Sequence, residues 1–499
     1  MGRGIFQPGR NCWRIGRAHR FRAVQDAADY FRLIRRALLS AERTIFILGW
    51  DLTATIDLDP GAAASKEPTR FDRVLKYVVR HCPGLECYIL AWDYSPVFLL
   101  ERDPFSRARF SWAMPKGIRF AFDAHCPAGA SHHQKVVVVD DQLAFCGGVD
   151  LTSHRWDTPA HRADEPRRRT PAGTRYGPYH EVQAMMDGPV AADLGELARE
   201  RWRATGVADL PAVAPSAATR WPADITPDLV NVDVAIARTS PRFDGRPPVR
   251  ECEALFLDSI AAAKRTIYIE NQYFTNTALT AALAGRLADP DGPDVVIVVP
   301  RDSHGWLEHR TIGALRDAAF QRLLAADSHR RLRIVAPIAS RAREIATFVH
   351  SKVMIVDDDL LRIGSANCTH RSMGVDTECD VAVDARRDDA VRAGIRRVRD
   401  RLVAEHLNLP ADEVTRAVER SGGLLAVLDR HRTAEHTLAR VQLPIEPLDP
   451  PPDALRLAVD PDEPVDVDRG TRSLRRWWIA VTRGVGRWLS GRRRGAAFG

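Results

Sequence analysis

Lysine is scarce in this sequence, since only six of its 72 lysine and arginine residues are lysines. The 499-residue chain also lacks an uninterrupted apolar run of about 18 residues, which a membrane-spanning helix needs. Its first 20 residues contain no apolar stretch of signal-peptide length. These absences argue against an integral membrane protein and against an exported one. We therefore expect a cytoplasmic globular protein, long enough for two or three domains.

Paired cysteines and common metal motifs are also missing. The eight cysteines have neither a CxxC pair nor zinc-type spacing, so we expect idle or buried thiols rather than a disulfide framework or a structural metal. The sequence contains no HExxH motif, no EF-hand loop and no carboxylate cluster of the kind that two-metal phosphodiesterases use. We expect no metal and no cofactor.

The net charge of +7 is concentrated at one end of the chain. Residues 469–499 contain nine arginines and no acid, which leaves 7 − 9 = −2 for the other 468 residues. A body shaped for duplex nucleic acid would usually carry its own basic stripe. The nearly neutral body therefore argues against a nucleic-acid partner.

The basic tail also carries large apolar side chains at three- and four-residue spacing. This pattern is typical of a helix that lies on an anionic membrane surface, and it predicts peripheral association with the inner face of the membrane. Glycines at 484, 486 and 491 would weaken such a helix, and they leave a solvated or disordered tail as the alternative. The spaced apolar residues are Leu474, Trp477, Trp478, Val481, Val485, Trp488 and Leu489.

The sequence repeats itself over most of its length. HHQKVVVVD at 132–140 matches VHSKVMIVD at 349–357, and LIRRALLSAERTIFI at 33–47 matches LFLDSIAAAKRTIYI at 255–269. Such duplication predicts an α/β protein built from two similar lobes, each a sheet flanked by helices. The predicted order is a first lobe (1–212), a linker (213–229), a second lobe (230–415), a helical extension (416–445), an acidic proline-rich extended tether (446–468) and the basic tail (469–499).

Each HxKxxxxD motif predicts a β-hairpin, in which an apolar strand, an acidic turn and a returning strand follow one another. Residues two apart on a strand share a face, so His133 projects with Lys135, and His350 with Lys352. The valine-rich runs are apolar on both faces, which favours strands at the centre of a sheet covered by helices.

These residue types point to phosphoryl chemistry. One imidazole can attack phosphorus to form a phosphohistidine, while a second, protonated imidazole donates to the departing oxygen. Two lysine ammoniums can neutralise the phosphate oxygens, so that no metal is needed. The candidate catalytic residues are His133, Lys135, Asp140, Glu181, His350, Lys352, Asp357 and Glu378.

The carboxylates in this set have different expected roles. Glu181 is predicted to hold His133 and Glu378 to hold His350, because each follows its own hairpin on a predicted strand; surface acids or structural salt bridges are the alternative. Asp140 and Asp357 lie at the turn ends, where we expect them to stabilise the hairpins rather than to transfer protons.

The chain resembles the phospholipase D superfamily, whose signature is the duplicated HxKxxxxD motif. It is most similar to the branch of eukaryotic phosphatidylcholine-hydrolysing enzymes, through HHQKVVVVD, AFCGGVDLTSHRWDTPAH, IYIENQYF at 267–274 and FVHSKVMIVDDDLLRIGSANCTHRSMGVDTECD. Its richness in arginine and the absence of lipid-binding regulatory domains before the first half suggest a bacterial member.

This resemblance implies an α/β fold of two pseudo-twofold-related lobes, each a mixed sheet flanked by helices, with one active site at the lobe interface. It also implies hydrolysis of glycerophospholipids to phosphatidic acid, often with transfer of the phosphatidyl group to an alcohol. It implies that His133 is the nucleophile and His350 the general acid. Residues matching the polar pocket positions of the family are Asp150, Asn367, Ser365, Asn271 and Glu270. A capping role after the Gly-Gly turn remains an alternative for Asp150, and Ser365 against Gly148 is the visible asymmetry between the half-sites.

Three alternatives stay open. A cardiolipin-synthase-like phosphatidyltransferase or a nuclease of the same superfamily would use the same catalytic residues, and a catalytically silent lipid-surface adaptor would keep only the fold. The two complete motifs argue against the adaptor. An insertion at 161–178, HRADEPRRRTPAGTRYGP, carries arginines that either contact a lipid head group or face water, and water is favoured.

Overall fold

The computed structural model describes residues 4–62, 65–93, 114–206, 210, 219–302, 309–385, 388–432, 434–443, 456–457 and 459–464. The basic tail at 469–499 lies outside these residues, as does most of the predicted tether.

The first lobe contributes seven strands that pair side by side. In spatial order they are β4 (Ile118–Asp123), β3 (Glu86–Trp92), β2 (Thr44–Gly49), β5 (Val136–Val139), β6 (Leu143–Gly147), β8 (Val182–Asp187) and β1 (Arg14–Gln25). The pairings β4–β3 and β3–β2 are parallel, and the others are antiparallel.

The second lobe repeats this order from the other side of the junction. Antiparallel pairing of β1 with β9 joins the two sets of strands, so the pseudo-twofold axis passes between β1 and β9. The second set is β9 (Leu229–Ser240), β18 (Glu378–Asp384), β17 (Leu360–Gly364), β16 (Val353–Val356), β11 (Thr266–Glu270), β12 (Asp294–Val298) and β13 (Leu332–Ser340). Again the last two pairings are parallel. The predicted duplicated α/β architecture is confirmed.

Short strands complete the sheets. β10 (Val249–Arg250) pairs with β9, while β14 (Ile345–Ala346) and β19 (Thr437–Arg440) pair with β13. β7 (Tyr179–His180) of the first lobe pairs in parallel with β15 (Phe348–Val349) of the second. This two-stranded sheet crosses the lobe junction.

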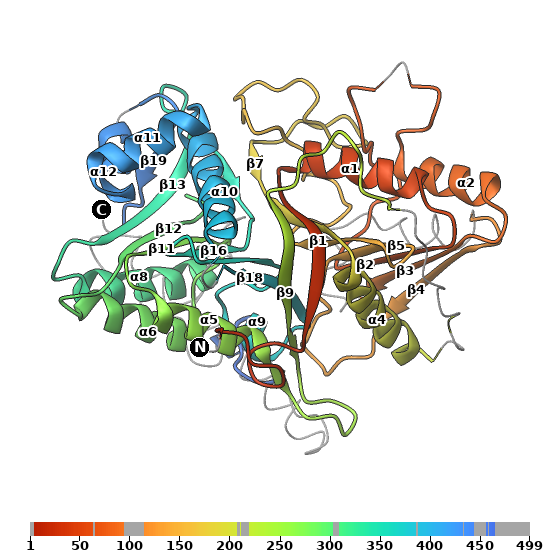
Figure 1. Ribbon diagram of the computed structural model, residues 1–499, viewed down its shortest axis with the longest axis horizontal. Helices are drawn as coiled ribbons and strands as arrows, with labels where there is room; N and C mark the ends of the chain where they lie inside the picture. The colour runs from red at the N-terminus through yellow and green to blue at the C-terminus, as the bar shows by residue number, and fades with distance from the viewer. Residues whose placement is uncertain are drawn as a thin grey trace, which may run out of the picture.

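Helices pack on the strands (Figure 1) and enclose three apolar cores. α1 (Ala27–Leu39) and α2 (Phe71–His81) enclose the apolar core of the first lobe, and α5 (Glu251–Ala262), α6 (Thr277–Ala288) and α8 (Ala314–Ala326), which follows the π-helical turn His309–Gly313, enclose that of the second. A third core lies between the lobes under α4 (Pro189–Ala204) and α10 (Asp389–Leu407). The short α9 (His370–Gly374) follows β17, and α11 (Ala411–Ser421) and α12 (Leu424–His431) follow α10.

The two acidic turns form as the sequence predicts. Asp140 and Asp141 have φ of 54° and 57°, and Asp357 and Asp358 have φ of 54° and 60°. Two successive positive φ values characterise the type I′ turn that matches the twist of a hairpin, and aspartate tolerates this region better than most residues. In each hairpin the motif lysine and histidine lie just before the first strand, β5 or β16, at the end away from the turn.

Segments outside the two lobes pack more tightly than the sequence predicts. Trp221, in the predicted linker, belongs to the core of the first lobe. Asp460, in the predicted extended tether, is fully buried and lies 2.5 Å from the Thr275 hydroxyl and 2.9 Å from His370 Nδ1. The extended interpretation is therefore wrong at Asp460, because this carboxylate satisfies buried donors of the second lobe.

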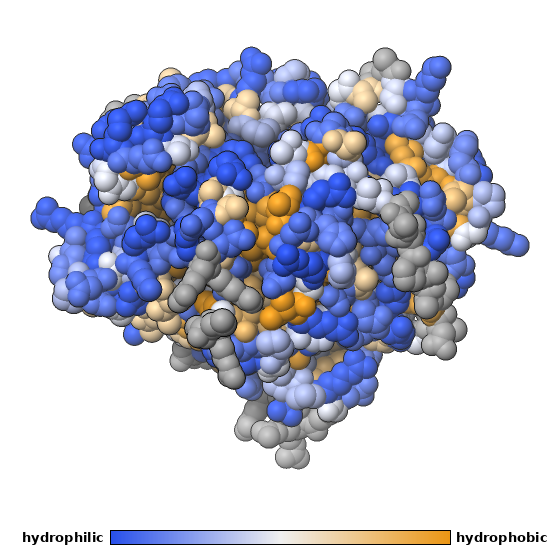
Figure 2. Space-filling view, viewed as in Figure 1, coloured by the Kyte–Doolittle hydropathy of each residue, from blue (hydrophilic) through white to orange (hydrophobic). Residues whose placement is uncertain are grey.

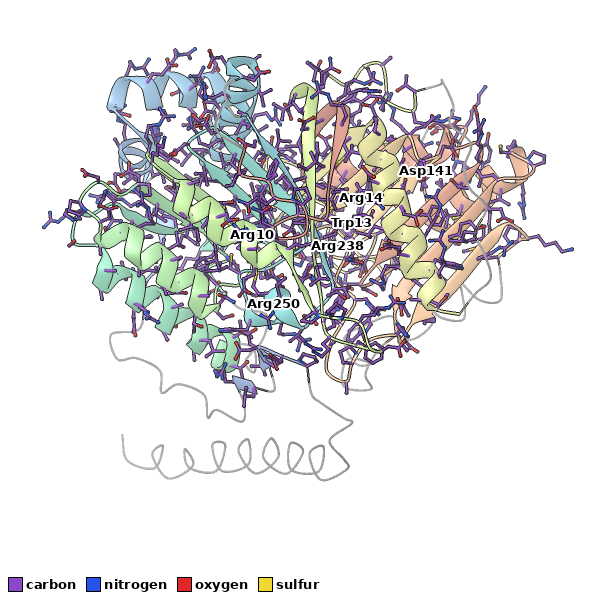
Figure 3. All side chains as sticks on the ribbon, turned by 60° about the horizontal axis from the view of Figure 1, so that its bottom comes forward. Arg10, Trp13, Arg14, Asp141, Arg238 and Arg250 are labelled. Atoms are coloured by element: carbon purple, nitrogen blue, oxygen red, sulfur yellow. The ribbon has the colours of Figure 1, made fainter. Side chains whose placement is uncertain are left out.

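The N-terminal segment also crosses the lobe boundary. Phe6 and Cys12 belong to the core of the second lobe, although the sequence assigns residues 1–212 to the first. Figure 3 labels Trp13, whose ring lies between the guanidinium carbons of Arg14 and Arg238 at 4.1 and 4.4 Å from its centroid. These cation–π contacts help to join β1 to β9.

In the residues that the structure describes, none of the helices is both long and apolar enough to span a bilayer. Figure 2 shows a mostly hydrophilic face on which apolar side chains form separate patches.

Candidate active site

The two motif histidines bind carboxylates of the opposite lobe. His133 Nδ1 lies 3.0 and 2.9 Å from the two carboxylate oxygens of Glu378, and His350 Nδ1 bonds to Glu181. The predicted partners are therefore exchanged, since Glu181 was expected to hold His133 and Glu378 to hold His350. Each catalytic pair contains residues of both lobes.

Backbone pairing across the junction explains this exchange. The His133 N–H donates to the Thr377 carbonyl at 3.0 Å, next to Glu378, and the His350 N–H donates to the His180 carbonyl at 3.0 Å, next to Glu181. Each histidine segment thus runs parallel to the carboxylate segment of the other lobe. The sequence does not reveal this pairing, because each carboxylate follows its own hairpin along the chain and the contact between the lobes leaves no local mark.

The lysines fold back along their own strands. Lys135 Nζ donates to the His133 carbonyl at 2.9 Å and lies 3.3 Å from Asp150 Oδ2. Lys352 Nζ donates to the His350 carbonyl and to Gln272 Oε1 at 3.2 Å. Both ammoniums are almost fully buried; among the described residues, that of Lys135 lies beside a carboxylate and that of Lys352 has none within ion-pair distance.

The cations act on the histidines of both lobes. Burial lowers the pKa of His133 well below its usual range, and Lys135 and then Lys352 add to this effect. Burial likewise lowers the pKa of His350, assisted by Lys352, Arg155 and Lys135. Because each lysine influences both imidazoles, the four motif side chains converge on one site.

The carboxylates and Lys352 are shifted by the same desolvation. Burial raises the pKa of Glu181 to about 7 and that of Glu378 well above its usual range. Burial lowers the pKa of Lys352 to about 7. A buried anion such as a phosphodiester would offset the two ammoniums and favour protonation of an imidazole.

Ser365 and Gly148 make the two pairs unequal. The Ser365 hydroxyl donates to Glu378 Oε2 at 2.5 Å, whereas Gly148 occupies the equivalent place beside Glu181. A Cβ at Gly148 would lie 2.8 Å from Glu181 Oε2, which is too close for any larger residue there. Within the described residues Glu181 Oε2 has no hydrogen-bond partner. Ser365 therefore supports a catalytic carboxylate and is not placed as a direct pocket ligand.

Three of the predicted pocket residues lie near the motifs. Asp150 was expected either to cap a backbone N–H or to line the pocket, and it does both. Its Oδ1 accepts the Trp50 N–H at 2.8 Å, and its Oδ2 faces Lys135. Asn367 Oδ1 is buried and has no hydrogen-bond partner in the described part of the chain. Asn271 instead braces the backbone, because its Oδ1 accepts the Cys368 N–H at 3.0 Å.

Glu270 is not a pocket residue. Its carboxylate accepts hydrogen bonds from the Tyr268 hydroxyl at 2.5 Å and the Ser351 hydroxyl at 2.7 Å, and lies 2.8 Å from His180 Nε2. The prediction that it binds substrate is wrong, because these donors enclose it completely.

Asp140 and Asp357 stabilise the hairpins, as expected, and do not contact the imidazoles. Asp140 accepts the N–H groups of Arg43 and Thr44 at 2.8 Å, and Asp357 accepts those of Arg265 at 2.6 Å and Thr266 at 2.7 Å. Their inclusion in the catalytic set is therefore corrected: they fix the start of β2 and β11 against the turns.

Three residues of the site were not among those predicted from the sequence. The Trp50 ring meets the His133 ring edge-on, with centroids 6.3 Å apart, and the Tyr179 ring lies 5.7 Å from that of His350. The guanidinium carbon of Arg155 lies 5.0 Å from the Tyr179 centroid. Trp50 directly follows β2, and Tyr179 lies two residues before Glu181. Their positions next to segments of the site could have indicated a role.

Two family models match the chain in the order of its lobes. The model described as "Phospholipase D" matches residues 122–221, and the model described as "Cardiolipin synthase, PLD-like domain" matches residues 256–395. The chain belongs to the phospholipase D superfamily. Its superfamily relatives support a phosphodiesterase-type enzyme in general.

Curated relatives in the superfamily are distant in sequence. Phospholipase D A of Dictyostelium discoideum is 24% identical over 72% of this chain and 32% of the relative. Phospholipase D alpha 1 is 23% identical in Carica papaya, over 81% of this chain and 68% of the relative, and 23% identical in Ricinus communis, over 70% and 59%. The chain thus spans from about a third to about two thirds of these relatives.

A solved structure shares the fold. Phosphatidylserine synthase from Haemophilus influenzae Rd KW20 superposes with a TM-score of 0.52 at 13% identity, covering 83% of this chain and 94% of that one. At this identity the likeness concerns the superfamily fold alone.

The arginines of the insertion at 161–178 face solvent, as expected, with one exception. The arginines at 162, 167, 169 and 175 are exposed. Arg168 is buried and lies 2.9 and 3.0 Å from the Asp157 carboxylate oxygens, so the solvent interpretation is wrong for this side chain.

Proposed function

We propose that the protein is a phospholipase D that hydrolyses glycerophospholipids to phosphatidic acid without a metal and can transfer the phosphatidyl group to an alcohol. The observation that supports this most strongly is the crossed geometry. His133 and His350 each present Nδ1 to a buried carboxylate of the other lobe, and the buried ammoniums of Lys135 and Lys352 each donate to the carbonyl of the histidine in the same motif. With Nδ1 held, Nε2 of each ring is the nitrogen left for chemistry.

In the first step, Nε2 of His133 attacks phosphorus. A P–N bond forms, the bond between phosphorus and the head-group oxygen breaks, and Nε2 of His350 gives its proton to that oxygen. Lys135 and Lys352 stabilise the charge on the non-bridging oxygens. The products are a phosphatidyl-histidine and the free head-group alcohol.

In the second step, His350 accepts a proton from water or from an alcohol. The resulting oxygen nucleophile attacks phosphorus, the P–N bond to His133 breaks, and phosphatidic acid or a new phosphatidyl alcohol leaves. His350 is then protonated for the next turnover, and His133 is neutral.

Ser365 supports this division of labour. Its hydroxyl donates to Glu378 and spreads the negative charge of that carboxylate, which weakens its support for an imidazolium at His133. Glu181 receives no such hydroxyl from Gly148, so its charge is more available to a protonated His350. A neutral nucleophile at His133 and an acid at His350 fit this asymmetry.

A phosphatidyltransferase is the second candidate function. The match of residues 256–395 to a family model described as "Cardiolipin synthase, PLD-like domain" favours it. Such an enzyme would use a phospholipid hydroxyl, rather than water, in the second step. A nuclease is disfavoured, because affinity for nucleic acid depends on many phosphate-neutralising side chains and the chain outside the tail has a charge of only −2.

The basic tail is the proposed contact with the lipid surface. Its nine arginines would attract anionic lipids, and its tryptophans would enter the head-group region. We propose that this contact holds the enzyme at the inner face of a membrane, beside its proposed phospholipid substrate.

The test is product analysis with vesicles of mixed phospholipids, with and without ethanol, using wild-type protein and His133→Asn as the inactive control. Phosphatidic acid in water and phosphatidylethanol with ethanol would support the lipase and its covalent intermediate. Cardiolipin from phosphatidylglycerol, without phosphatidic acid, would favour the phosphatidyltransferase. Cleavage of nucleic acid with no lipid product would refute the lipid assignment.

A further inference from the structure

Four side chains from distant segments meet behind the active site. Asp26 follows β1, His161 lies in the insertion, His180 lies in β7, and Glu405 lies in α10 of the second lobe. One nitrogen or oxygen atom of each lies within 4.8 Å of the others. All four are buried, and Figure 1 shows α10 beside β7 at the junction.

Their spacing fits a tetrahedron around a small cation. Glu405 Oε1 lies 2.9 Å from His161 Nε2 and 2.6 Å from His180 Nδ1, and the Asp26 oxygens lie 3.6 and 3.3 Å from the same two nitrogens. Ligands bound tetrahedrally to zinc at about 2.0 Å are separated by about 3.3 Å. The two Glu405 separations are shorter than this value, the one from Asp26 Oδ1 to His180 equals it, and the one from Asp26 Oδ2 to His161 is longer.

Both histidines are oriented as metal ligands usually are. His161 Nδ1 lies 3.0 Å from Asp157 Oδ2, and His180 Nε2 lies 2.8 Å from Glu270 Oε2. A histidine that ligates a metal through one nitrogen typically gives its other N–H to a carboxylate, which fixes the ring. Here each ring has a carboxylate on its outer nitrogen and turns the other nitrogen to the common centre.

One atom of the cluster points independently to a ligand. Asp26 Oδ2 is buried and has no hydrogen-bond partner among the described residues, although it lies 3.6 Å from His161 Nε2. A buried carboxylate oxygen without a partner is costly in a protein interior. A cation at the centre of the cluster would satisfy it.

We propose that Asp26, His161, His180 and Glu405 bind one divalent transition-metal ion, with zinc as the preferred metal. Two carboxylates and two neutral imidazoles carry a charge of −2, which such an ion neutralises, and imidazole with carboxylate is a suitable donor set for it. The sequence did not indicate this site, because its ligands come from four segments without local spacing and include no cysteine.

The proposed role is structural. The four ligands close a tetrahedron, whereas a catalytic zinc keeps an open position. The ion would tie α10 of the second lobe to three segments of the first. It would also lie close behind the catalytic pairs, since His180 precedes Glu181 and Glu270 holds the Ser351 hydroxyl next to His350.

The first test is the metal content of full-length protein purified without chelator and without a histidine tag. One equivalent of zinc per chain is expected by mass spectrometry of the metal. Protein unfolded with a chelator and refolded should take up one equivalent of Co²⁺ and show the intense visible absorption of a tetrahedral site, and its thermal unfolding midpoint should rise with added Zn²⁺.

Isosteric variants locate the ion. Asp26→Asn and Glu405→Gln keep the shape of the cluster while each removes one charge, so the bound metal should fall at least about tenfold. His370→Gln is the matched control, because His370 is also a buried histidine beside a carboxylate, Asp460, yet lies outside the cluster. It should retain its zinc.

Two results would overturn the proposal. One is wild-type protein that is metal-free as purified and takes up neither Zn²⁺ nor Co²⁺ on refolding, which would make the cluster a proton-sharing network. The other is bound metal that remains at one equivalent in both isosteric variants, which would place it elsewhere. If a variant fails to fold, the wild-type metal content and the Co²⁺ spectrum still decide the question.

Discussion

Exchanging the carboxylates for amides would test the crossed assignment of the catalytic pairs. Glu378→Gln removes the charge beside His133, and Glu181→Gln removes the charge beside His350. Glu378 is fully buried, and both of its oxygens lie within 3.0 Å of Nδ1. A hydrogen bond to a charged group contributes about 1.5–3 kcal/mol, which corresponds to a loss of about 10- to 150-fold in the rate of the step that needs it.

Substrates with different leaving groups distinguish the role of the nucleophile, His133, from that of the general acid, His350. A p-nitrophenolate departs without a proton, so its release needs the nucleophile His133 but not the acid His350. The measurement is the rate of the first turnover on a soluble diester, once with a p-nitrophenyl and once with an alkyl leaving group. Glu378→Gln should slow both by about 10- to 150-fold, whereas Glu181→Gln should slow the alkyl diester by that factor and the p-nitrophenyl diester by less than about threefold.

A matched control and the opposite result complete the test. Glu251→Gln also removes a buried carboxylate, and it should leave both rates unchanged. Glu251 lies 3.1 Å from Arg238, with which it pairs, and neither residue belongs to the site. If Glu181→Gln slowed both substrates while Glu378→Gln spared the p-nitrophenyl diester, then Glu181 would act through the nucleophile, and crossed pairs with His133 as the nucleophile would be refuted.

Four further outcomes follow from the same geometry. His133→Ala and His350→Ala should each abolish turnover on an alkyl diester, because the two imidazoles act as one unit; substantial activity in either variant would contradict a shared site. Burial holds the pKa of Lys352 at about 7 and only its protonated form neutralises phosphate, so kcat/KM should fall as the pH rises above 7, and a pH profile that stays flat to pH 9 would contradict this. Deleting residues 469–499 should weaken co-sedimentation with anionic vesicles, most at low salt, without changing hydrolysis of a soluble diester; unchanged sedimentation would remove the proposed anchor. Brief EDTA treatment should leave the hydrolysis rate unchanged, since the proposed chemistry uses imidazoles and ammoniums and the proposed zinc is enclosed; a loss restored by a divalent ion would contradict the metal-free steps.

Local features of the site could be predicted from sequence because they obey short-range rules. The period of two along a strand places His133 with Lys135, and the Asp-Asp pairs fit a tight turn; both hairpins are confirmed. The duplication itself predicts the two lobes, whereas the position of the site between them was implied by the resemblance to the superfamily. The other inferences needed only spacing and repetition.

Long-range contacts could not be predicted in the same way. The choice of Glu378 rather than Glu181 for His133 depends on a parallel pairing between segments 245 residues apart, which leaves no mark on local sequence. Glu270 lies in a motif that resembles pocket-lining segments, but strand alternation turns its side chain into a buried network. Asp460 follows a proline-rich stretch, and only the buried donors of Thr275 and His370 explain why it docks.

The crossed pairs also affect how activity appears during synthesis. When His133 leaves the ribosome its carboxylate partner has not been made, and 245 further residues must be added before Glu378 exists. His350 finds its partner, Glu181, in the first lobe, which is already complete. The proposed nucleophile, His133, is held by Glu378 only after the second lobe has folded onto the first. A nascent or truncated chain that ends before β18 therefore lacks the carboxylate that binds His133, and the proposed active site stays incomplete until both lobes have folded together.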